Sequence, residues 1–208
     1  ALFWILNGFA KKVLADYAAL NYVDRIFENP NYYSGVEVIL GVFGYSLQIY
    51  ADFSGYTDIA IGIALLLGFR LKTNFNSPYK AASTSEFWQR WHISLSSWLK
   101  EYLYIPLGGN KVNKTRLYFN LWLVFLVSGL WHGASWSFIF WGAYHGFFLI
   151  IERAFFGKVL MSIGKLPSIL LTFFIVNIGW VFFRIERIND AFLYLKKMFV
   201  FNVYPETK

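Results

Sequence analysis

Hydrophobic residues along this chain gather in long runs, and two of these runs flank a single histidine, His132. Residues 117–130 and 136–151 are almost entirely apolar, which is typical of membrane helices. The segment between them, Gly133-Ala134-Ser135, predicts a break. An ionisable side chain beside such a break is costly in a bilayer, so His132 is the first candidate functional residue.

The same pattern predicts further helices. Residues 1–10 are predicted to end one helix, followed by an amphipathic stretch to Tyr22 and a loop at Asn29-Pro30-Asn31. Residues 36–51 and 56–69 are predicted to be two membrane spans joined through residues 52–55, and residues 169–183 a final span. An amphipathic end follows at residues 191–201. Every predicted element is helical, so the predicted fold class is all-α.

Residues 85–105 differ from these spans because one side of the predicted helix is polar. Large apolar side chains recur at helical spacing along the segment: Phe87, Trp91, Leu95, Trp98, Tyr102 and Ile105. Charged side chains, among them Glu86, Arg90 and Lys100, take the opposite side. This pattern predicts a single helix that lies in or near the membrane interface, with its apolar face towards lipid or neighbouring helices.

The composition places the chain in a membrane. Its residues are 57% hydrophobic, 22% aromatic and 15% charged, and a soluble domain lacks the interior to bury 9 Trp, 14 Tyr and 23 Phe. The net charge of +7 then indicates basic loops beside anionic lipid. No basic stripe is interleaved with aromatic platforms, so we expect no nucleic-acid partner. The absence of cysteine excludes disulfides and thiolate chemistry.

Helix length bears on the depth of His132. Residues 117–131 would form about 22 Å of helix, against about 30 Å of hydrocarbon. Two short helices that meet at the break then place His132 within the membrane. Basic residues precede and follow this pair, which suits outer ends facing the cytoplasm: Lys111, Lys114, Arg116, Arg153, Lys158 and Lys165. Arg184 and Arg187 would then lie on the opposite side, so some segments are expected to be re-entrant or horizontal. Residues 1–208 are predicted to form one transmembrane domain, and the hydrophobic start without an initiator Met indicates that further helices precede it.

The three histidines, His92, His132 and His145, supply the candidate chemistry. A neutral imidazole can take a proton from a hydroxyl and return it to a leaving group. The alternative is a structural histidine bonded to backbone, and this alternative is stronger for His145, beside Phe147 and Phe148, than for His132. His132 and His145 do not have i, i+4 spacing, and no carboxylate or cysteine lies near them, so we expect no metal.

A second polar cluster, Asp52, Ser54 and Asp58, falls at the predicted junction between residues 36–51 and 56–69. Two carboxylates at a break between apolar segments could form a proton or cation path, as in transporters. The structural alternative is that Ser54 or Asp58 caps the start of the second span, and caps are commoner than ion paths. These three residues, together with Trp131 and His145, are the candidate substrate-binding residues.

Three long stretches resemble the membrane-bound O-acyltransferases. The resemblance is to the bacterial branch that contains the alginate O-acetyltransferase membrane subunit and the teichoic-acid D-alanyl transfer protein. It is carried by residues 50–69 (YADFSGYTDIAIGIALLLGF), 86–110 (EFWQRWHISLSSWLKEYLYIPLGGN) and 128–146 (SGLWHGASWSFIFWGAYHG). The order and spacing of the stretches also fit, and the similarity extends from about residue 8 to residue 187.

The resemblance implies a polytopic fold in which many helices ring a funnel, with short, tilted and interfacial helices at its centre. It implies that His132 is the family's essential membrane histidine and acts as general base. It also implies that His92, at the second signature position, orients the thioester carbonyl or stabilises the oxyanion. Against the family pattern, the N-terminal helices are missing here and the last helices end early.

The resemblance also implies a reaction and a setting. An acyl group, favoured to be acetyl, passes from a cytoplasmic thioester to a hydroxyl of a cell-surface or exported polysaccharide. The donor is acyl-coenzyme A or an acyl carrier protein, and no cofactor is tightly bound. Transfer is direct or passes through an extracytoplasmic acyltransferase partner. The expected location is the bacterial cytoplasmic (inner) membrane, as a multi-pass protein in contact with lipid.

Two other functions fit the residues. In a proton-coupled transporter or channel subunit, Asp52 and Asp58 would form the coupling site and the histidines would relay protons. A non-catalytic scaffold would anchor a partner outside the membrane and would need neither His132 nor His92. Acyl transfer from a labelled thioester distinguishes the enzyme from both.

Overall fold

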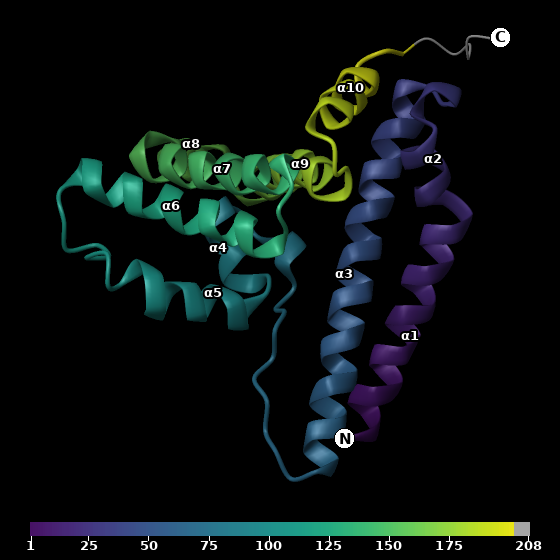
Figure 1. The fold of residues 1–208 in the computed structure, drawn as a ribbon, viewed down its shortest axis with the longest axis horizontal. Coiled ribbons are helices and arrows are strands. Elements are labelled where there is room, and N and C mark those ends of the chain that lie inside the picture. The colour runs from purple at the N-terminus through teal and green to yellow at the C-terminus, as the bar shows by residue number, and fades with distance from the viewer. Residues whose placement is uncertain (202–208) are drawn as a thin grey trace. The chain divides into compact units, whose positions relative to one another are not determined.

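A computed structural model describes residues 1–201, and every regular element within that range is helical, which confirms the all-α fold class. The elements fall into two compact units (Figure 1): residues 1–74 with those from Phe192 onwards, and residues 75–191. Two helices, α3 (Gly35–Leu66) and α9 (Lys165–Arg184), are long and apolar enough to cross a membrane. The funnel and the single domain stay predictions.

The first unit is an antiparallel helical hairpin (Figure 1). α1 (Leu2–Ala18) continues through a π-helical turn, η1 (Ala19–Val23), into α2 (Asp24–Glu28), and α3 returns after the short turn η2 (Pro30–Tyr32). The break predicted around Pro30 is therefore confirmed. Ser34 begins α3 because it exchanges hydrogen bonds with Glu37: the Ser34 N–H donates to the carboxylate at 2.8 Å, and the Glu37 N–H donates to Ser34 Oγ at 3.4 Å.

Two predictions for this unit are wrong. α1 does not end at residue 10, and residues 36–51 and 56–66 belong to one helix of 32 residues, which ends before residue 69. Carboxylates remain inside α3 because lysines of α1 neutralise them: Lys11 Nζ lies 2.6 Å from Asp58, and Lys12 pairs with Asp52. Neither Ser54 nor Asp58 caps a helix start, so the capping interpretation is also wrong.

Gly55, which falls in the predicted junction, is a packing residue of α3. A Cβ added at Gly55 would lie 2.8 Å from the carbonyl oxygen of Gly8, and a Cβ at Gly8 would lie 2.5 Å from that of Gly55. Small residues at a crossing let two helix backbones approach closely, as they do in membranes. The small residues of this segment thus indicated a helix contact and not a loop.

The second unit is built around an antiparallel hairpin of α6 (Lys114–His132) and α7 (Trp136–Ile151). α9 packs on α7 in the opposite direction: the Tyr144 hydroxyl donates to the Ile175 carbonyl at 2.8 Å, and the Ser135 hydroxyl donates to the Glu186 carbonyl at 2.7 Å. The other helical elements are η3 (Pro78–Lys80), α4 (Thr84–Arg90), α5 (Ile93–Leu99), η4 (Lys100–Tyr104), η5 (Glu152–Phe156), α8 (Gly157–Ile163) and α10 (Ile188–Met198), whose residues from Phe192 on belong to the first unit.

The predicted break at residues 133–135 and the predicted bounds of α7 are confirmed. α6 is longer than predicted because Asn113 caps it, with its side-chain oxygen accepting from the Arg116 N–H at 2.9 Å. Nineteen residues span about 28 Å, close to the hydrocarbon thickness. Because α6 is long enough to cross the hydrocarbon layer, its length is no longer an argument that His132 lies deep in the membrane. The depth of His132 stays a prediction.

Glycines set the spacing between α6 and α7. A Cβ at Gly129 would overlap the carbonyl oxygen of Phe138, and a Cβ at Gly142 would overlap that of Phe125. A Cβ at Gly146 would lie 3.0 Å from the Cα of Trp122. All three positions face the partner backbone, so the hairpin is as closely packed as its backbones allow.

We predict that Gly142→Ala lowers the melting temperature of the full-length protein in detergent by several degrees. In an exposed helix this substitution stabilises by about 1 kcal/mol, but here the added methyl meets the Phe125 carbonyl, and overpacking costs about 1–3 kcal/mol. The matched control is Ala143→Val, which adds two carbons at the neighbouring, partly exposed position and leaves the melting temperature within about 1 °C. Equal melting temperatures for Gly142→Ala and wild type would contradict the close packing.

Candidate histidine site

The site begins at a break in the helix predicted for residues 85–105. That prediction of a single helix is wrong, because the segment divides into α4, α5 and η4. Trp91 is extended, with φ −102° and ψ 131°, and His92 takes the left-handed conformation, with φ 45° and ψ 55°. A residue with a Cβ pays roughly 1–2 kcal/mol in this region, so the surroundings must hold it there.

Hydrogen bonds across the break replace those that the helix loses. The Ser96 hydroxyl donates to the Trp88 carbonyl at 3.1 Å. The Asn76 N–H donates to the Arg90 carbonyl at 2.9 Å, and the Arg90 guanidinium donates back to the Asn76 carbonyl at 3.2 Å. Neither Gly nor Pro marks the break in the sequence, so the local pattern carries no signal for it.

Glu152 anchors the other end of α4. Its carboxylate accepts from the Thr84 N–H at 2.6 Å, from the Thr84 hydroxyl, and from the Ser85 N–H at 3.2 Å. A carboxylate is favourable at the N-terminus of a helix, where backbone N–H groups lack partners. Because Glu152 directly follows α7, this contact ties α4 to the end of α7 that lies far from His132.

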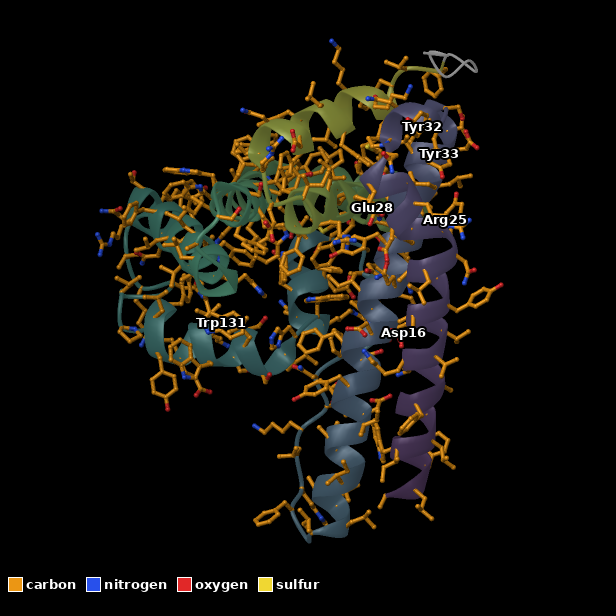
Figure 2. All side chains as sticks on the ribbon, turned by 45° about the vertical axis from the view of Figure 1, so that its right-hand side comes forward. Asp16, Arg25, Glu28, Tyr32, Tyr33 and Trp131 are labelled. Atoms are coloured by element: carbon orange, nitrogen blue, oxygen red, sulfur yellow. The ribbon has the colours of Figure 1, made fainter. Side chains whose placement is uncertain are left out.

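His92 and His132 meet at one tryptophan. The ring centroid of Trp131 lies 6.3 Å from that of His92 and 4.9 Å from that of His132. His92 follows the last turn of α4, and His132 is the final residue of α6. Trp131 is 61% exposed, and its side chain is labelled in Figure 2. The structure thus places both predicted catalytic histidines, and one predicted substrate-binding residue, together.

The inner side of His132 is a wall of aromatic rings. Its centroid lies 5.2 Å from Trp141, 5.0 Å from Phe183 and 6.2 Å from Phe138. His132 itself is half-buried. His92 lies outside the two candidate spans, and burial lowers its pKa to about 4, so this ring is neutral at pH 7.

His145 lies in the core of the second unit. The side chain is fully buried against the rings of Trp88 at 4.9 Å, Trp141 at 5.2 Å and Tyr144 at 5.2 Å. Neither ring nitrogen has a hydrogen-bond partner in the described part of the chain. Trp141 contacts both His145 and His132, so the third histidine lies one aromatic ring behind the site. Its role in substrate binding stays a prediction.

Asp52, Ser54 and Asp58 lie in the first unit. Asp58 accepts from Asn7 at 2.7 Å as well as from Lys11, and the two ion pairs account for both carboxylates as contacts between α1 and α3. The substrate-binding role of these three residues stays a prediction. Within residues 1–201 no three His, Asp or Glu side chains gather where they could hold a metal ion.

Sequence reasoning missed Glu152, Trp141 and Phe183. Helical spacing could have found Trp141, because residues 141 and 145 are four apart and share one face of α7. Glu152 and Phe183 approach the site from distant segments, and no local pattern records such contacts.

Comparison with known proteins shows what the chain is similar to. The model of the membrane-bound O-acyltransferase (MBOAT) family matches residues 1–185. The chain is 44% identical over 205 residues to the probable alginate O-acetylase AlgI of Pseudomonas aeruginosa, covering 96% of this chain and 38% of that protein. It is 47% identical over 193 residues to the peptidoglycan O-acetyltransferase of Helicobacter pylori, covering 91% and 36%. It is 30% identical over 194 residues to the teichoic acid D-alanyltransferase of Bacillus subtilis, covering 86% and 49%. The chain therefore spans less than half the length of each.

We predict that Glu152→Gln in the full-length protein speeds hydrogen exchange of the Thr84–Arg90 amides by about tenfold or more. The substitution removes charge-assisted bonds, each contributing about 1.5–3 kcal/mol, from the first turn of α4. Exchange measured by mass spectrometry reports this opening directly. Glu101→Gln, on the exposed side of η4, is the matched control and leaves exchange in α4 unchanged. Unchanged exchange in Glu152→Gln would contradict the anchoring role.

Proposed function

The chain belongs to the membrane-bound O-acyltransferase family, and we propose that it carries the catalytic histidines of an enzyme that moves an acyl group from a thioester to a hydroxyl. The observation that supports this most strongly is the convergence of His92 and His132 on Trp131. Two half-buried imidazoles near one another can serve the two tasks of acyl transfer, which are proton removal and stabilisation of an oxyanion.

His132 is the proposed general base. Its ring nitrogen takes the proton from the acceptor hydroxyl while that oxygen attacks the thioester carbonyl carbon. The tetrahedral intermediate then collapses, the carbon–sulphur bond breaks, and the proton passes to the leaving thiolate. The aromatic wall of Trp141, Phe183 and Phe138 fixes the ring and keeps water from its inner side.

His92 is the proposed electrophilic partner. A neutral imidazole carries one N–H, which can donate to the carbonyl oxygen as negative charge develops there. The left-handed backbone at His92 ends α4 at the point where its ring faces Trp131. Strain of this kind at a candidate site is evidence of a functional constraint.

The donor is proposed to arrive from the cytoplasm. Basic residues cluster where α6 begins, after α7 and where α9 begins: Lys111, Lys114, Arg116, Arg153, Lys158 and Lys165. This end is cytoplasmic by the positive-inside rule, and its charge would attract the phosphates of coenzyme A or of a carrier protein's pantetheine arm. The proposed setting is a multi-pass protein of the bacterial inner membrane.

The acyl group and acceptor follow from the relatives. Two are named O-acetylating enzymes, of alginate and of peptidoglycan, so we propose acetyl transfer to a polysaccharide outside the cytoplasm. An extracytoplasmic acyltransferase partner could relay the group. The ion pairs of Asp52 and Asp58 serve helix packing, so no observation favours the alternative of a transporter.

We predict that His132→Ala in the full-length protein lowers acyl transfer at least about 100-fold at wild-type abundance, because general-base catalysis contributes about 10²–10⁴-fold. We expect His92→Asn to lower transfer less, because Asn tolerates the left-handed backbone and keeps a side-chain N–H donor. Transfer is measured as the radioactive acetyl groups that pass from labelled acetyl-coenzyme A to the polymer fraction of membranes.

Tyr102→Ala is the control for this experiment. Tyr102 is an exposed aromatic on η4, remote from the contacts of His132, and its loss leaves transfer unchanged. Normal transfer by His132→Ala at equal abundance would overturn the proposal.

A further inference from the structure

His145 is a buried titratable residue that the proposed mechanism does not use. Its side chain is fully buried, and within residues 1–201 neither ring nitrogen has a hydrogen-bond partner. A buried imidazole without hydrogen bonds is costly, because its polar atoms lose their hydration and gain no partner in exchange. Hydrogen bonding therefore does not explain a histidine at this position, whereas the size of the ring and its contacts can.

The imidazole lies against the backbone of α9. A Cβ built on Gly179 would overlap Nε2 of His145 and would lie 2.9 Å from its Cε1. Because protein interiors are closely packed, atoms that overlap in this way must move apart. The two outer atoms of the imidazole and the missing side chain at residue 179 thus set one distance, which is the distance between α7 and α9.

This contact lies one helical turn behind the rings that hold His132. Trp141 precedes His145 by four residues on α7. Phe183 follows Gly179 by four residues on α9. The rings of Trp141 and Phe183 lie 5.3 Å apart, and their centroids lie 5.2 Å and 5.0 Å from that of His132. Since residues four apart share one face of a helix, the spacing at His145 carries over to this pair of rings.

His145 also contacts the helix that leads to the second imidazole of the site. The ring of Trp88, on α4, lies 4.9 Å from that of His145, and Trp88 precedes His92 by four residues. The Trp88 carbonyl accepts from the Ser96 hydroxyl across the break at His92. His145 therefore lies where α4, α7 and α9 meet, and each of these helices leads to a residue of the histidine site.

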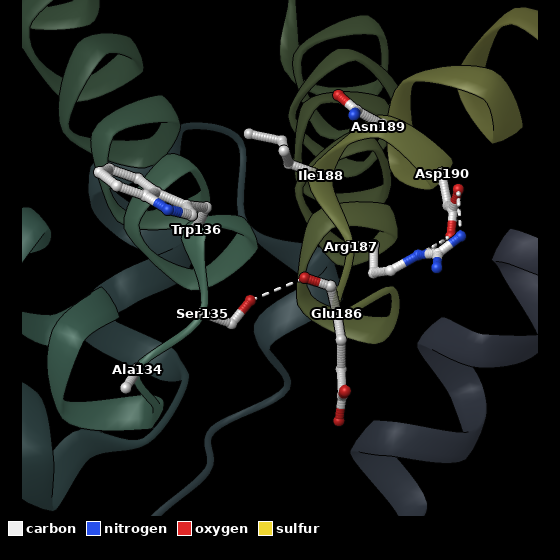
Figure 3. A pocket seen from close by; sticks show the side chains of 8 residues that line it. All are labelled: Ala134, Ser135, Trp136, Glu186, Arg187, Ile188, Asn189 and Asp190. Atoms are coloured by element: carbon white, nitrogen blue, oxygen red, sulfur yellow. Dashed lines mark hydrogen bonds and ion pairs between the residues drawn. The ribbon is translucent and has the colours of Figure 1, made fainter.

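Two hydrogen bonds fix α7 against α9 and the segment that follows it. The Ser135 hydroxyl donates to the Glu186 carbonyl at 2.7 Å (Figure 3), and the Tyr144 hydroxyl donates to the Ile175 carbonyl at 2.8 Å. Gly179 lies between the two acceptors along the chain. Because the helices are joined on both sides of Gly179, a larger group there would tilt α9 against α7 and move the rings that contact His132.

We propose that His145 is a positioning residue for acyl transfer. Its ring is the spacer between α7 and α9 that holds Trp141 and Phe183 against His132. The inference rests on the proposed function, because it names a residue that acts on the proposed general base. The role depends on the size of the ring and not on its proton chemistry, so another side chain that restores the spacing can replace the imidazole.

An exchange of size between residues 145 and 179 tests this proposal in the full-length protein. Gly179→Ala adds a methyl group that overlaps the imidazole, whereas His145→Leu removes the two outer ring atoms, because a leucine side chain ends at its δ carbons. We expect Gly179→Ala to lower the kcat of acetyl transfer at least about tenfold with KM for acetyl-coenzyme A unchanged, because misplacement by about 1 Å can cost about 100-fold. We expect His145→Leu alone to lower kcat less, since it leaves a gap and no overlap.

The double variant gives the decisive comparison. In the His145→Leu background, we expect Gly179→Ala to raise kcat to within about threefold of the wild type, because the methyl fills the gap and the two sites are coupled. This comparison needs no folded Gly179→Ala single variant. Gly142→Ala is the matched control, because its methyl meets the Phe125 carbonyl, and we expect His145→Leu to leave its defect unchanged.

Two results would overturn the inference. If Gly179→Ala lowers kcat further in the His145→Leu background, the imidazole itself is required and the ring is not a spacer. If the variants lower only the melting temperature, with kcat per folded enzyme at the wild-type value, the contact between His145 and Gly179 is structural alone. Failure of the proposed function is seen separately, as normal transfer by His132→Ala.

Discussion

The close approach of α6 and α7 underlies the histidine site. Because Gly129 and Gly142 each face a carbonyl of the opposite helix, the two backbones meet without side chains between them. The last turn of α6 then lies against the first turns of α7, and His132 is held beside Phe138 and Trp141. α9 packs on the same hairpin and adds Phe183. A wider hairpin would part the imidazole from the rings that orient it.

The second imidazole depends on contacts at both ends of a very short helix. Glu152 fixes the first turn of α4, and the bonds between Asn76 and Arg90 fix its last turn. α4 has only seven residues and is held at both ends, so it has little conformational freedom. The left-handed His92 that follows it therefore projects towards Trp131. Through Glu152, the C-terminal end of α7 is linked to the position of His92. These contacts hold the backbone that carries His92 in one position, as a preorganised site requires.

Sequence patterns predicted the elements that depend on long apolar runs. The turn after His132, the bounds of α7 and the span within α9 follow from hydrophobicity and from small residues at a break. The junction predicted at Asp52 and the continuous helix predicted through His92 are wrong for the same reason. In both places, contacts with residues distant in the sequence decide the local structure. Polar residues around Asp52 suggested a junction, but lysines of α1 neutralise the carboxylates within a continuous helix. At His92 an amphipathic period suggested a continuous helix, but distant residues, Asn76 and Ser96, hold a break.

The proposed account places the thioester on the basic side of the second unit and the reacting hydroxyl beside His132. The most direct test is cryo-electron microscopy of the full-length protein with a non-reactive acetyl-coenzyme A analogue in which a methylene replaces the sulphur. The account predicts the carbonyl carbon of the analogue within about 4 Å of the His132 ring, with its oxygen towards His92. An analogue bound with its acetyl group beyond reach of both imidazoles would contradict the account.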